Sequence, residues 1–157
     1  MTSLLSTHET DGPVFTLLPA THVYTLTPIG YVDSPLHDRA DAPRQGSEGA
    51  PDAWIALEPQ FAEAARDLRV GDEVLLLTWL DRGDREVLSV HPRGDASVPL
   101  HGVFSTRSPD RPNPVGIHRV TIVAADGATR FRVSELEAID GTPVIDIKPV
   151  LDRQREI

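Results

Sequence analysis

Cysteine is absent from the 157-residue sequence. Its absence excludes a disulfide framework, a thiolate nucleophile and a zinc site with cysteine ligands, and it fits a reducing compartment. No apolar run approaches the roughly 20 residues that span a membrane. The first residues, MTSLLSTHETDGP, lack the basic and apolar regions of a signal peptide. We therefore expect a cytoplasmic protein with no membrane partner.

Other signatures are missing as well. The sequence has neither a glycine-rich dinucleotide fingerprint nor a phosphate-binding P-loop, which argues against a Rossmann fold. Its six histidines show no metal-ligand spacing, so no metal site is predicted. Lysine occurs once, at Lys148. The net charge of −9 weakens any model of non-specific nucleic-acid binding, which depends on neutralising phosphates, but it leaves room for a local basic patch.

Short β-branched and aromatic runs alternate with turn sequences through most of the chain. They predict strands at 22–32, 73–80, 86–92, 98–104, 116–123, 129–136 and 143–150. One helix is predicted near 58–70, with an apolar stripe made of Phe61, Ala64, Ala65 and Leu68. A long polar loop is predicted at 33–53. This pattern favours a single mainly β domain, either a barrel or a sandwich.

The stretch GVFSTRSPDRPNPVGIHRV, from Gly102 to Val120, combines arginines with three prolines. Each proline fixes its own φ and biases the preceding residue to an extended conformation, so the stretch cannot be helical. A stiff backbone of this kind can hold side chains at fixed angles. Arginine offers a planar fork for a carboxylate or phosphate, and glycine permits close approach of backbone or ligand. The pattern therefore indicates either a binding strip or a rigid turn with solvated arginines.

A second stretch, IDGTPVIDIKP, places Asp146 and Lys148 two residues apart in a predicted strand. Strand alternation puts them on one face together with Val144, and puts Ile145 and Ile147 on the other. The two charged side chains can pair at the surface or bracket a polar ligand. His101 and His118 flank the proline-rich stretch, where each is either an ordinary strand histidine or part of a site.

These two stretches together resemble the TrmO/TsaA-like family. The resemblance rests on VFSTRSPDRPNPVG and DGTPVIDIKP, with PIGYVDSP, APRQ and WLDR in the right order, and it spans about 26–152. It implies a single-domain β-barrel that uses S-adenosylmethionine to methylate N6 of threonylcarbamoyladenosine next to the anticodon of tRNA. It also implies a homodimer. The barrel domain would cover 22–152, between an N-terminal arm at 1–21 and a tail at 153–157.

The resemblance also maps S-adenosylmethionine contacts onto this sequence. They fall on the proline-rich strip, the loop after the central strand, the Asp-Gly-Thr-Pro turn and the long loop: Arg107, Ser108, Arg111, Pro112, Asn113, Gly116, Ile117, Asp81, Arg82, Glu137, Ala138, Ile139, Asp140, Gly141, Thr142, Arg44 and Gln45. The catalytic residues stay open, with Asp146, Lys148 and His101 as candidates and His118 as a further possible base.

Three functions remain in competition. The first is a tRNA methyltransferase, which the local arginine excess of residues 102–122 favours. The second is a methyltransferase of the same fold that acts on a small molecule, favoured by the short chain and the acidic balance. The third is a non-catalytic, dimeric S-adenosylmethionine-binding protein. A fold alone does not choose among them.

Overall fold

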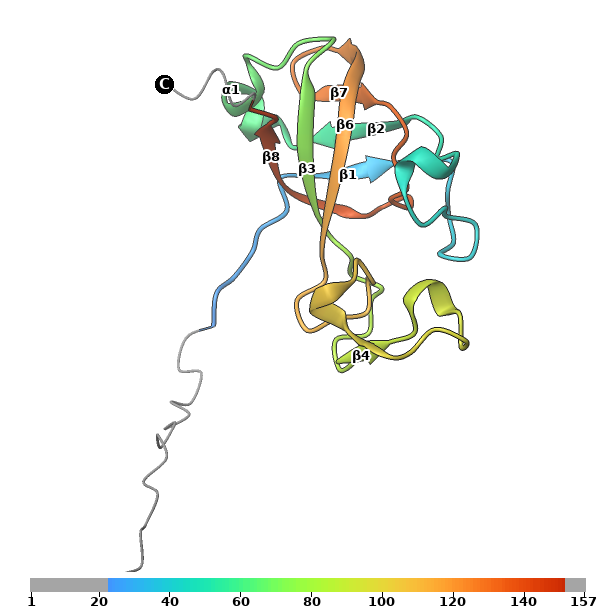
Figure 1. The fold of residues 1–157 in the computed structure, drawn as a ribbon. Coiled ribbons are helices and arrows are strands. Elements are labelled where there is room, and N and C mark those ends of the chain that lie inside the picture. The colour runs from blue at the N-terminus through green and yellow to red at the C-terminus, as the bar shows by residue number, and fades with distance from the viewer. Residues whose placement is uncertain (1–22, 152–157) are drawn as a thin grey trace, which may run out of the picture.

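Six antiparallel strands close into one barrel in the computed structural model, which describes residues 23–151 (Figure 1). Around the barrel the order is β1, β2, β7, β6, β3 and β8. Their bounds are Gly30–Asp33, Ala53–Leu57, Arg130–Val133, Val115–Asp126, Glu73–Trp79 and Pro143–Pro149. The prediction of a mainly β barrel is confirmed, and the predicted arm and tail lie outside the described residues.

The interior of the barrel is filled by alternate side chains of the strands. In β3, Val74, Leu76 and Thr78 are buried while their neighbours are more exposed. Each fully buried aliphatic side chain contributes about 1.5–3 kcal/mol relative to an exposed one. The other strands contribute Val32, Ile55, Val120, Ile122, Phe131, Val133 and Val144. This single core needs no disulfide or metal to hold the wall together.

The predicted strands differ from the observed ones near the start of the barrel. The predicted strand 22–32 begins only at Gly30, because residues 23–29 make no strand pairing. Strand β2 was not predicted, since WIAL lies between a polar loop and a helix signal and is too short to show alternation. In the barrel it gains its place by pairing with β1 on one side and β7 on the other.

The predicted helix is shorter than its sequence pattern. A 3-10 turn, Pro59–Phe61, leads into α1, Ala62–Ala65. Beyond it, the N–H groups of Arg66 and Leu68 bond to carbonyls three residues back, which tightens the chain and ends the α-helix. Of the predicted stripe, Ala65 is buried and Leu68 packs on the core, but Ala64 is exposed.

A bulge in β8 changes which side chains face inward. The register pairs Leu77 with Asp146 but Thr78 with Val144, so Ile145 is an extra residue on β8. Val144 is therefore buried in the core with Ile147 packed beside it. The predicted grouping of Val144 with Asp146 and Lys148 on one face is wrong, because the bulge shifts the alternation between them.

Between β3 and β6 the chain leaves the barrel and forms a lobe, residues 80–114, below it (Figure 1). The lobe contains β4, Ser89–Val90, paired with β5, His101–Gly102, and two 3-10 turns, Pro92–Gly94 and Val103–Ser105. The strands predicted at 86–92 and 98–104 shrink to these two short ones. Within residues 23–151, no helix has the length and apolar character needed to cross a bilayer.

Candidate functional site

The proline-rich strip, here residues 106–114, runs along the junction of lobe and barrel. It follows the 3-10 turn at Val103–Ser105 and enters β6 at Val115. Pro114 is buried and its carbonyl accepts a hydrogen bond from Leu80 N–H, which ties the strip to the end of β3 at 2.8 Å. The carbonyl of Pro112 accepts from Arg85 Nε at 2.8 Å. The strip is therefore fixed on both sides as well as stiffened by its own prolines.

The two arginines of the strip have different environments. Arg111 turns inward, where its Nη2 donates to the carbonyls of Val103 and of Thr106, the latter at 2.8 Å. Its Nε is buried and has no hydrogen-bond partner in the described chain. Arg107 is exposed and forms no ion pair with a described residue. Arg111 thus supports the strip, and Arg107 is the guanidinium that the strip presents outward.

The long loop at 33–53 packs against the strip. Arg39 donates to both carboxylate oxygens of Asp110 at 3.1 Å and to the carbonyl of Arg82 at 3.0 Å. Arg82 in turn donates to the carbonyl of His37 at 3.1 Å. Burial acts to raise the pKa of the Asp110 carboxyl, but the hydrogen bonds from Arg39 and Asp84 N–H and the Arg39 charge outweigh it, so the pKa lies below its usual range.

The same loop contacts the Asp-Gly-Thr-Pro turn. The N–H of Ser34 donates to Asp140 Oδ1 at 3.1 Å, and the N–H of Asp140 donates to the carbonyl of Leu36 at 2.6 Å. His37 Nδ1 lies 3.7 Å from Asp140 Oδ2. Gly141 has a φ of +77°, a conformation that suits glycine at this turn. Residues 34–39 therefore bridge the turn and the strip, two motifs that lie far apart in the sequence.

A buried line of three side chains crosses the wall beside the strip. Thr78 Oγ1 lies 2.9 Å from His118 Nε2, and His118 Nδ1 lies 2.8 Å from Glu137 Oε1. Burial acts to raise the pKa of the Glu137 carboxyl, but the hydrogen bond and charge of His118, its own backbone N–H and the Arg107 charge outweigh it and lower the pKa. Ionised Glu137 therefore stabilises the fold, and this stabilisation is lost as pH falls through the lowered pKa.

Gly116 is the reason that this line fits. It pairs with Thr78 in the β3–β6 ladder. A Cβ at position 116 would lie 2.8 Å from His118 Nε2 and closer still to Thr78 Oγ1. The glycine of the strip motif thus makes room for neighbouring side chains within the wall. Among residues 23–151, no group of three or more histidine, aspartate or glutamate side chains is placed to hold a metal.

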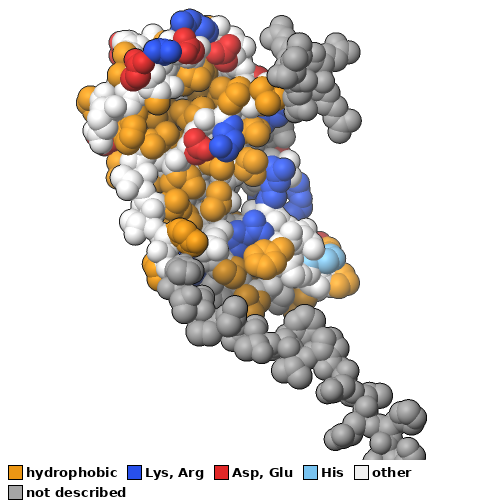
Figure 2. Space-filling view, turned by 90° about the vertical axis from the view of Figure 1, so that its left-hand side faces the viewer, with side chains coloured by type: hydrophobic (Ala, Val, Ile, Leu, Met, Phe, Trp, Pro, Cys, Tyr) orange, Lys and Arg blue, Asp and Glu red, His pale blue; other side chains and the backbone are white. Residues whose placement is uncertain are grey.

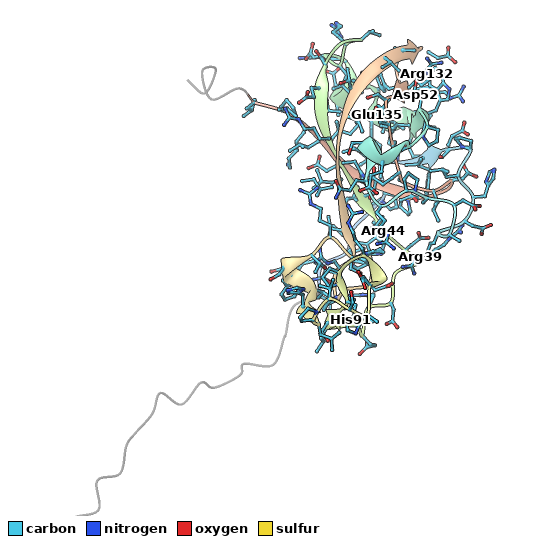
Figure 3. All side chains as sticks on the ribbon, turned by 45° about the vertical axis from the view of Figure 1, so that its right-hand side comes forward. Arg39, Arg44, Asp52, His91, Arg132 and Glu135 are labelled. Carbon is cyan, nitrogen blue, oxygen red and sulfur yellow. The ribbon has the colours of Figure 1, made fainter. Side chains whose placement is uncertain are left out.

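The remaining predicted contacts surround this junction. Figure 3 shows Arg39 and Arg44 between barrel and lobe, whereas Asp52, Arg132 and Glu135 lie higher on the barrel. Gln45 precedes the 3-10 turn Gly46–Glu48, whose Glu48 pairs with Arg93 of the lobe at 2.6 Å. Two predicted contacts accept hydrogen bonds: Ser108 from Asp110 N–H and Asn113 from Arg85. Ile117 and Asp81 are exposed. Ala138, Ile139 and Thr142 are buried.

Three catalytic candidates lie away from the junction contacts. Asp146 and Lys148 pair with each other at 2.7 Å on the outside of the barrel, where their side chains are half exposed. Asp146 lines an apolar groove of about 1070 Å³ beside α1, at the far end of the barrel from the lobe. His101 is exposed in β5 of the lobe. An exposed ion pair contributes little to stability, so surface pairing accounts for Asp146 and Lys148 as they stand.

The structure also shows functional candidates that sequence reasoning did not single out. Thr78 is the one hydroxyl residue in the apolar strand VLLLTWL, and that contrast was the available signal. Arg39 and Asp110 join loop and strip, but they are 71 positions apart in the sequence and no local pattern links them. Arg85 stacks over the Trp79 ring, 5.5 Å from its centroid, beside an open hollow of about 520 Å³ that it lines with Pro112.

Comparison with known proteins settles the family. The model of the tRNA-methyltransferase O N-terminal domain matches residues 31–154. The chain belongs to this family. A probable S-adenosyl-L-methionine-binding protein of Methanothermobacter thermautotrophicus is 42% identical over 124 residues, covering 79% of this chain and 88% of the relative. One from Halobacterium salinarum is 41% identical over 127 residues, covering 80% and 98%.

Solved structures agree with the fold. The crystal structure of TrmO from Pseudomonas aeruginosa matches with a TM-score of 0.67 and 29% identity over 87% of this chain. The match covers only 60% of that TrmO chain. A probable S-adenosyl-L-methionine-binding protein of Archaeoglobus fulgidus is 40% identical over 79% of this chain, which spans 33% of the relative's length. The chain thus corresponds to one part of these longer proteins.

Replacing Gly116 by alanine tests whether this glycine is needed for the Thr78–His118 contact. The added Cβ would overlap buried side chains, so we expect the free energy of unfolding to fall by about 1–3 kcal/mol in urea titration. Gly102→Ala is the matched control, because nothing lies within 4 Å of a Cβ there. A G116A variant as stable as G102A would show that the wall accommodates a side chain at this position.

Proposed function

We propose that this TrmO-family domain binds S-adenosylmethionine at the junction of barrel and lobe and transfers its methyl group to N6 of threonylcarbamoyladenosine next to the anticodon of tRNA. The observation that carries the proposal is the bridge made by residues 34–39, which joins the proline-rich strip to the Asp-Gly-Thr-Pro turn. The names of the archaeal relatives support the cofactor, and those of the family and solved structures support the methyl transfer.

The chemistry of the donor set at the junction fits this cofactor. Arg107 presents an exposed guanidinium suited to the carboxylate of the amino acid end. Glu137 and Asp140 supply carboxylates on the neighbouring segment, suited to its cationic groups. Exposed Ile117 lies next to the strip and offers apolar surface for a purine ring. The residues that would hold the cofactor therefore come from the strip, β6 and the Asp-Gly-Thr-Pro turn.

The cofactor supplies a methyl group on a positively charged sulfur, and the chain supplies position. Direct displacement requires the nucleophile, the methyl carbon and the leaving sulfur in line, so rigid holding of both reactants contributes much of the rate. The strip is suited to this work because prolines, Arg111 and Arg85 all fix its backbone. Within the described chain, the side chains of His101, Asp146 and Lys148 form no hydrogen bond or ion pair with the strip, so we assign none of them as a general base.

The exposed apolar side chains of the lobe are the reason to propose a second copy of the chain as its partner. Across residues 80–114 only Val103 and Pro114 are buried, while Phe104 is 84%, Leu88 69% and Leu100 59% exposed. Such a lobe leaves several large apolar side chains exposed in the single chain, which is typical of a surface that another protein covers. The hollow beside Arg85 and Pro112 is open. We infer that a partner subunit covers the lobe and completes the pocket, making the protein a homodimer.

Local charge supports a tRNA substrate despite the acidic total. On the face shown in Figure 2, Lys and Arg side chains lie low on the barrel and beside the lobe with few acidic side chains near them, whereas both signs of charge are mixed at the far end of the barrel. Within the described chain, Arg82 and Arg85 bond only neutral groups and form no ion pair. Arg44 and Arg107 add two more exposed cations. Exposed arginines near the pocket are what an RNA backbone requires.

Arg107→Ala tests the cofactor site. A lost charge-assisted contact costs about 1.5–3 kcal/mol, so we expect the Kd for S-adenosylmethionine in calorimetry to rise about 10- to 100-fold. Arg93→Ala is the control, because Arg93 is an exposed arginine already paired with Glu48. Equal affinities of the two variants would place Arg107 outside the site. The absence of heat with the wild type at millimolar ligand would contradict the proposed cofactor.

Methyl transfer is tested by incubating the purified protein with S-adenosylmethionine and tRNA that carries threonylcarbamoyladenosine. We expect nucleoside mass spectrometry to show the gain of one methyl group on that nucleoside. Unmodified tRNA of the same sequence is the control for the modified base. Cofactor binding without methylation of the tRNA would contradict this acceptor and favour a small-molecule methyltransferase or a non-catalytic binding protein.

Phe104→Asp tests the inferred dimer. Phe104 is exposed in the single chain, so the change should leave the fold intact but place a charge in the apolar interface. We expect light scattering at high micromolar concentration to give a dimer for the wild type and a monomer for F104D. Val70→Asp, at an exposed position near α1, should remain dimeric. A monomeric wild type would overturn the inference.

A further inference from the structure

Thr78, His118 and Glu137 form a hydrogen-bonded line that connects three elements of the fold. The family resemblance assigns no function to these three residues together. Thr78 lies in β3, His118 in β6 and Glu137 in the segment that leads to the Asp-Gly-Thr-Pro turn. Thr78 is fully buried, and the side chain of His118 is 5% exposed against 22% for Glu137. The line therefore begins in the barrel core and ends near the surface at the junction.

The hydrogen-bonding groups fix the direction of this line. An ionised carboxylate only accepts hydrogen bonds, so the bond to Glu137 requires a hydrogen on His118 Nδ1. In the neutral ring, Nε2 then accepts from the hydroxyl of Thr78, and in the charged ring Nε2 donates to the oxygen of that hydroxyl, so the contact persists in both forms. Both ring nitrogens are used, and the imidazole cannot rotate without breaking two bonds. His118 thereby sets the orientation of the Glu137 carboxylate.

A nucleophilic role for this line is excluded by burial. A hydroxyl, an imidazole and a carboxylate in sequence resemble the arrangement that activates a serine or threonine nucleophile. The hydroxyl of Thr78, however, belongs to a side chain with no exposure, and Gly116 packs directly over it. No substrate can reach it. The exposed end of the line is the carboxylate, so any contact with a ligand takes place there.

The surroundings of Glu137 point its carboxylate into the junction. A Cβ on Gly46, in the long loop, would overlap the carbonyl oxygen of Glu135 and lie 3.3 Å from Glu137 Oε2, so the loop backbone packs closely against this segment. The other charged groups that act on this carboxylate are His118 from β6 and Arg107 from the strip. Loop, strip and β6 thus converge on one carboxylate, whose first oxygen is held by His118 while the second is turned toward the loop.

We propose that His118 is a positioning residue, anchored by Thr78, that holds the Glu137 carboxylate at the junction to bind the cationic amino acid end of the cofactor. This inference rests on the proposed function for the identity of the ligand, but not for the coupling of His118 to Glu137. Because Glu137 is locked before binding, no rotamer freedom is lost when the ligand arrives. A carboxylate left free to turn would bind the same cation more weakly.

Two substitutions of His118 separate positioning from packing. The amide nitrogen of His118→Asn falls near the former Nδ1, so it can still donate to Glu137 but loses Thr78. The longer His118→Gln reaches the former Nε2, so it keeps a bond to Thr78 but loses Glu137. Each variant leaves one buried polar group unpaired, so both should lose similar stability in thermal melting. A purely structural histidine would give the two variants the same phenotype.

Cofactor affinity is the first measurement. In calorimetry with S-adenosylmethionine we expect H118N to bind within about threefold of the wild type and H118Q to bind at least about tenfold more weakly, near the level of Glu137→Gln. The double variant H118Q/E137Q should bind no more weakly than E137Q alone, because the two residues act through one contact. Equal affinities of H118N and H118Q would overturn the proposal.

Titration of Glu137 without ligand is the second measurement. Carbon NMR of protein labelled at glutamate carboxyls, with the resonance assigned by its loss in E137Q, should give the lowest pKa in the wild type, a higher one in H118N and the highest in H118Q. The same pKa in all three would overturn the coupling of His118 to Glu137. If the wild type binds no S-adenosylmethionine, the proposed function fails, and the order of pKa values still decides whether His118 positions the carboxylate.

Discussion

The pairing of β3 with β6 is the constraint on which the rest of the molecule depends. Seven residue pairs, from Glu73 with Thr121 to Trp79 with Val115, hold these strands in one register. The register brings Gly116 against Thr78 and places His118 within reach of the Thr78 hydroxyl. A slip of one residue would turn every inward side chain outward. It would also separate the strip from the wall that supports it, because the strip is the chain that enters β6.

Local chemistry explains which features the sequence could predict. The strands 73–80 and 116–123 were recognisable because each reads as a β-branched or aliphatic run, and the strip because three prolines restrict it regardless of tertiary context. Strand β2 could not be recognised from the sequence, because it is defined by its pairing partners. The inward and outward alternation of β8 could not be predicted either, because the bulge at Ile145 reverses it. Thr78 is 40 positions from His118, and His118 is 19 positions from Glu137, so no local pattern predicts that these side chains meet.

The predicted binding residues fall into two groups: those that present charge at the junction and those that hold its backbone and side chains in place. Arg107, Glu137 and Asp140 present charge at the junction, whereas Arg111 and Gly116 turn out to build the scaffold itself, one by bonding backbone carbonyls and the other by leaving space. A sequence motif cannot separate these roles, because both require the same residue at the same position. The distinction matters for experiment: a scaffold residue affects folding first, whereas a presented charge affects binding first.

The net charge of −9 describes the whole chain and not its junction. Three acidic side chains near the strip accept hydrogen bonds: Asp110 from Arg39, Asp140 from Ser34 N–H and Glu137 from His118. Asp81 and Glu86 are exposed beside Arg82 and Arg85 in the sequence. Among the arginines beside them, Arg82 and Arg85 bond only neutral groups. Because Coulomb interactions between exposed groups are screened within about 8 Å at physiological salt, a ligand at the junction responds to these neighbours and not to the acidic residues near α1. An acidic chain can therefore present both signs of charge at one site: arginines that bond only neutral groups, and the Glu137 carboxylate that His118 holds in place.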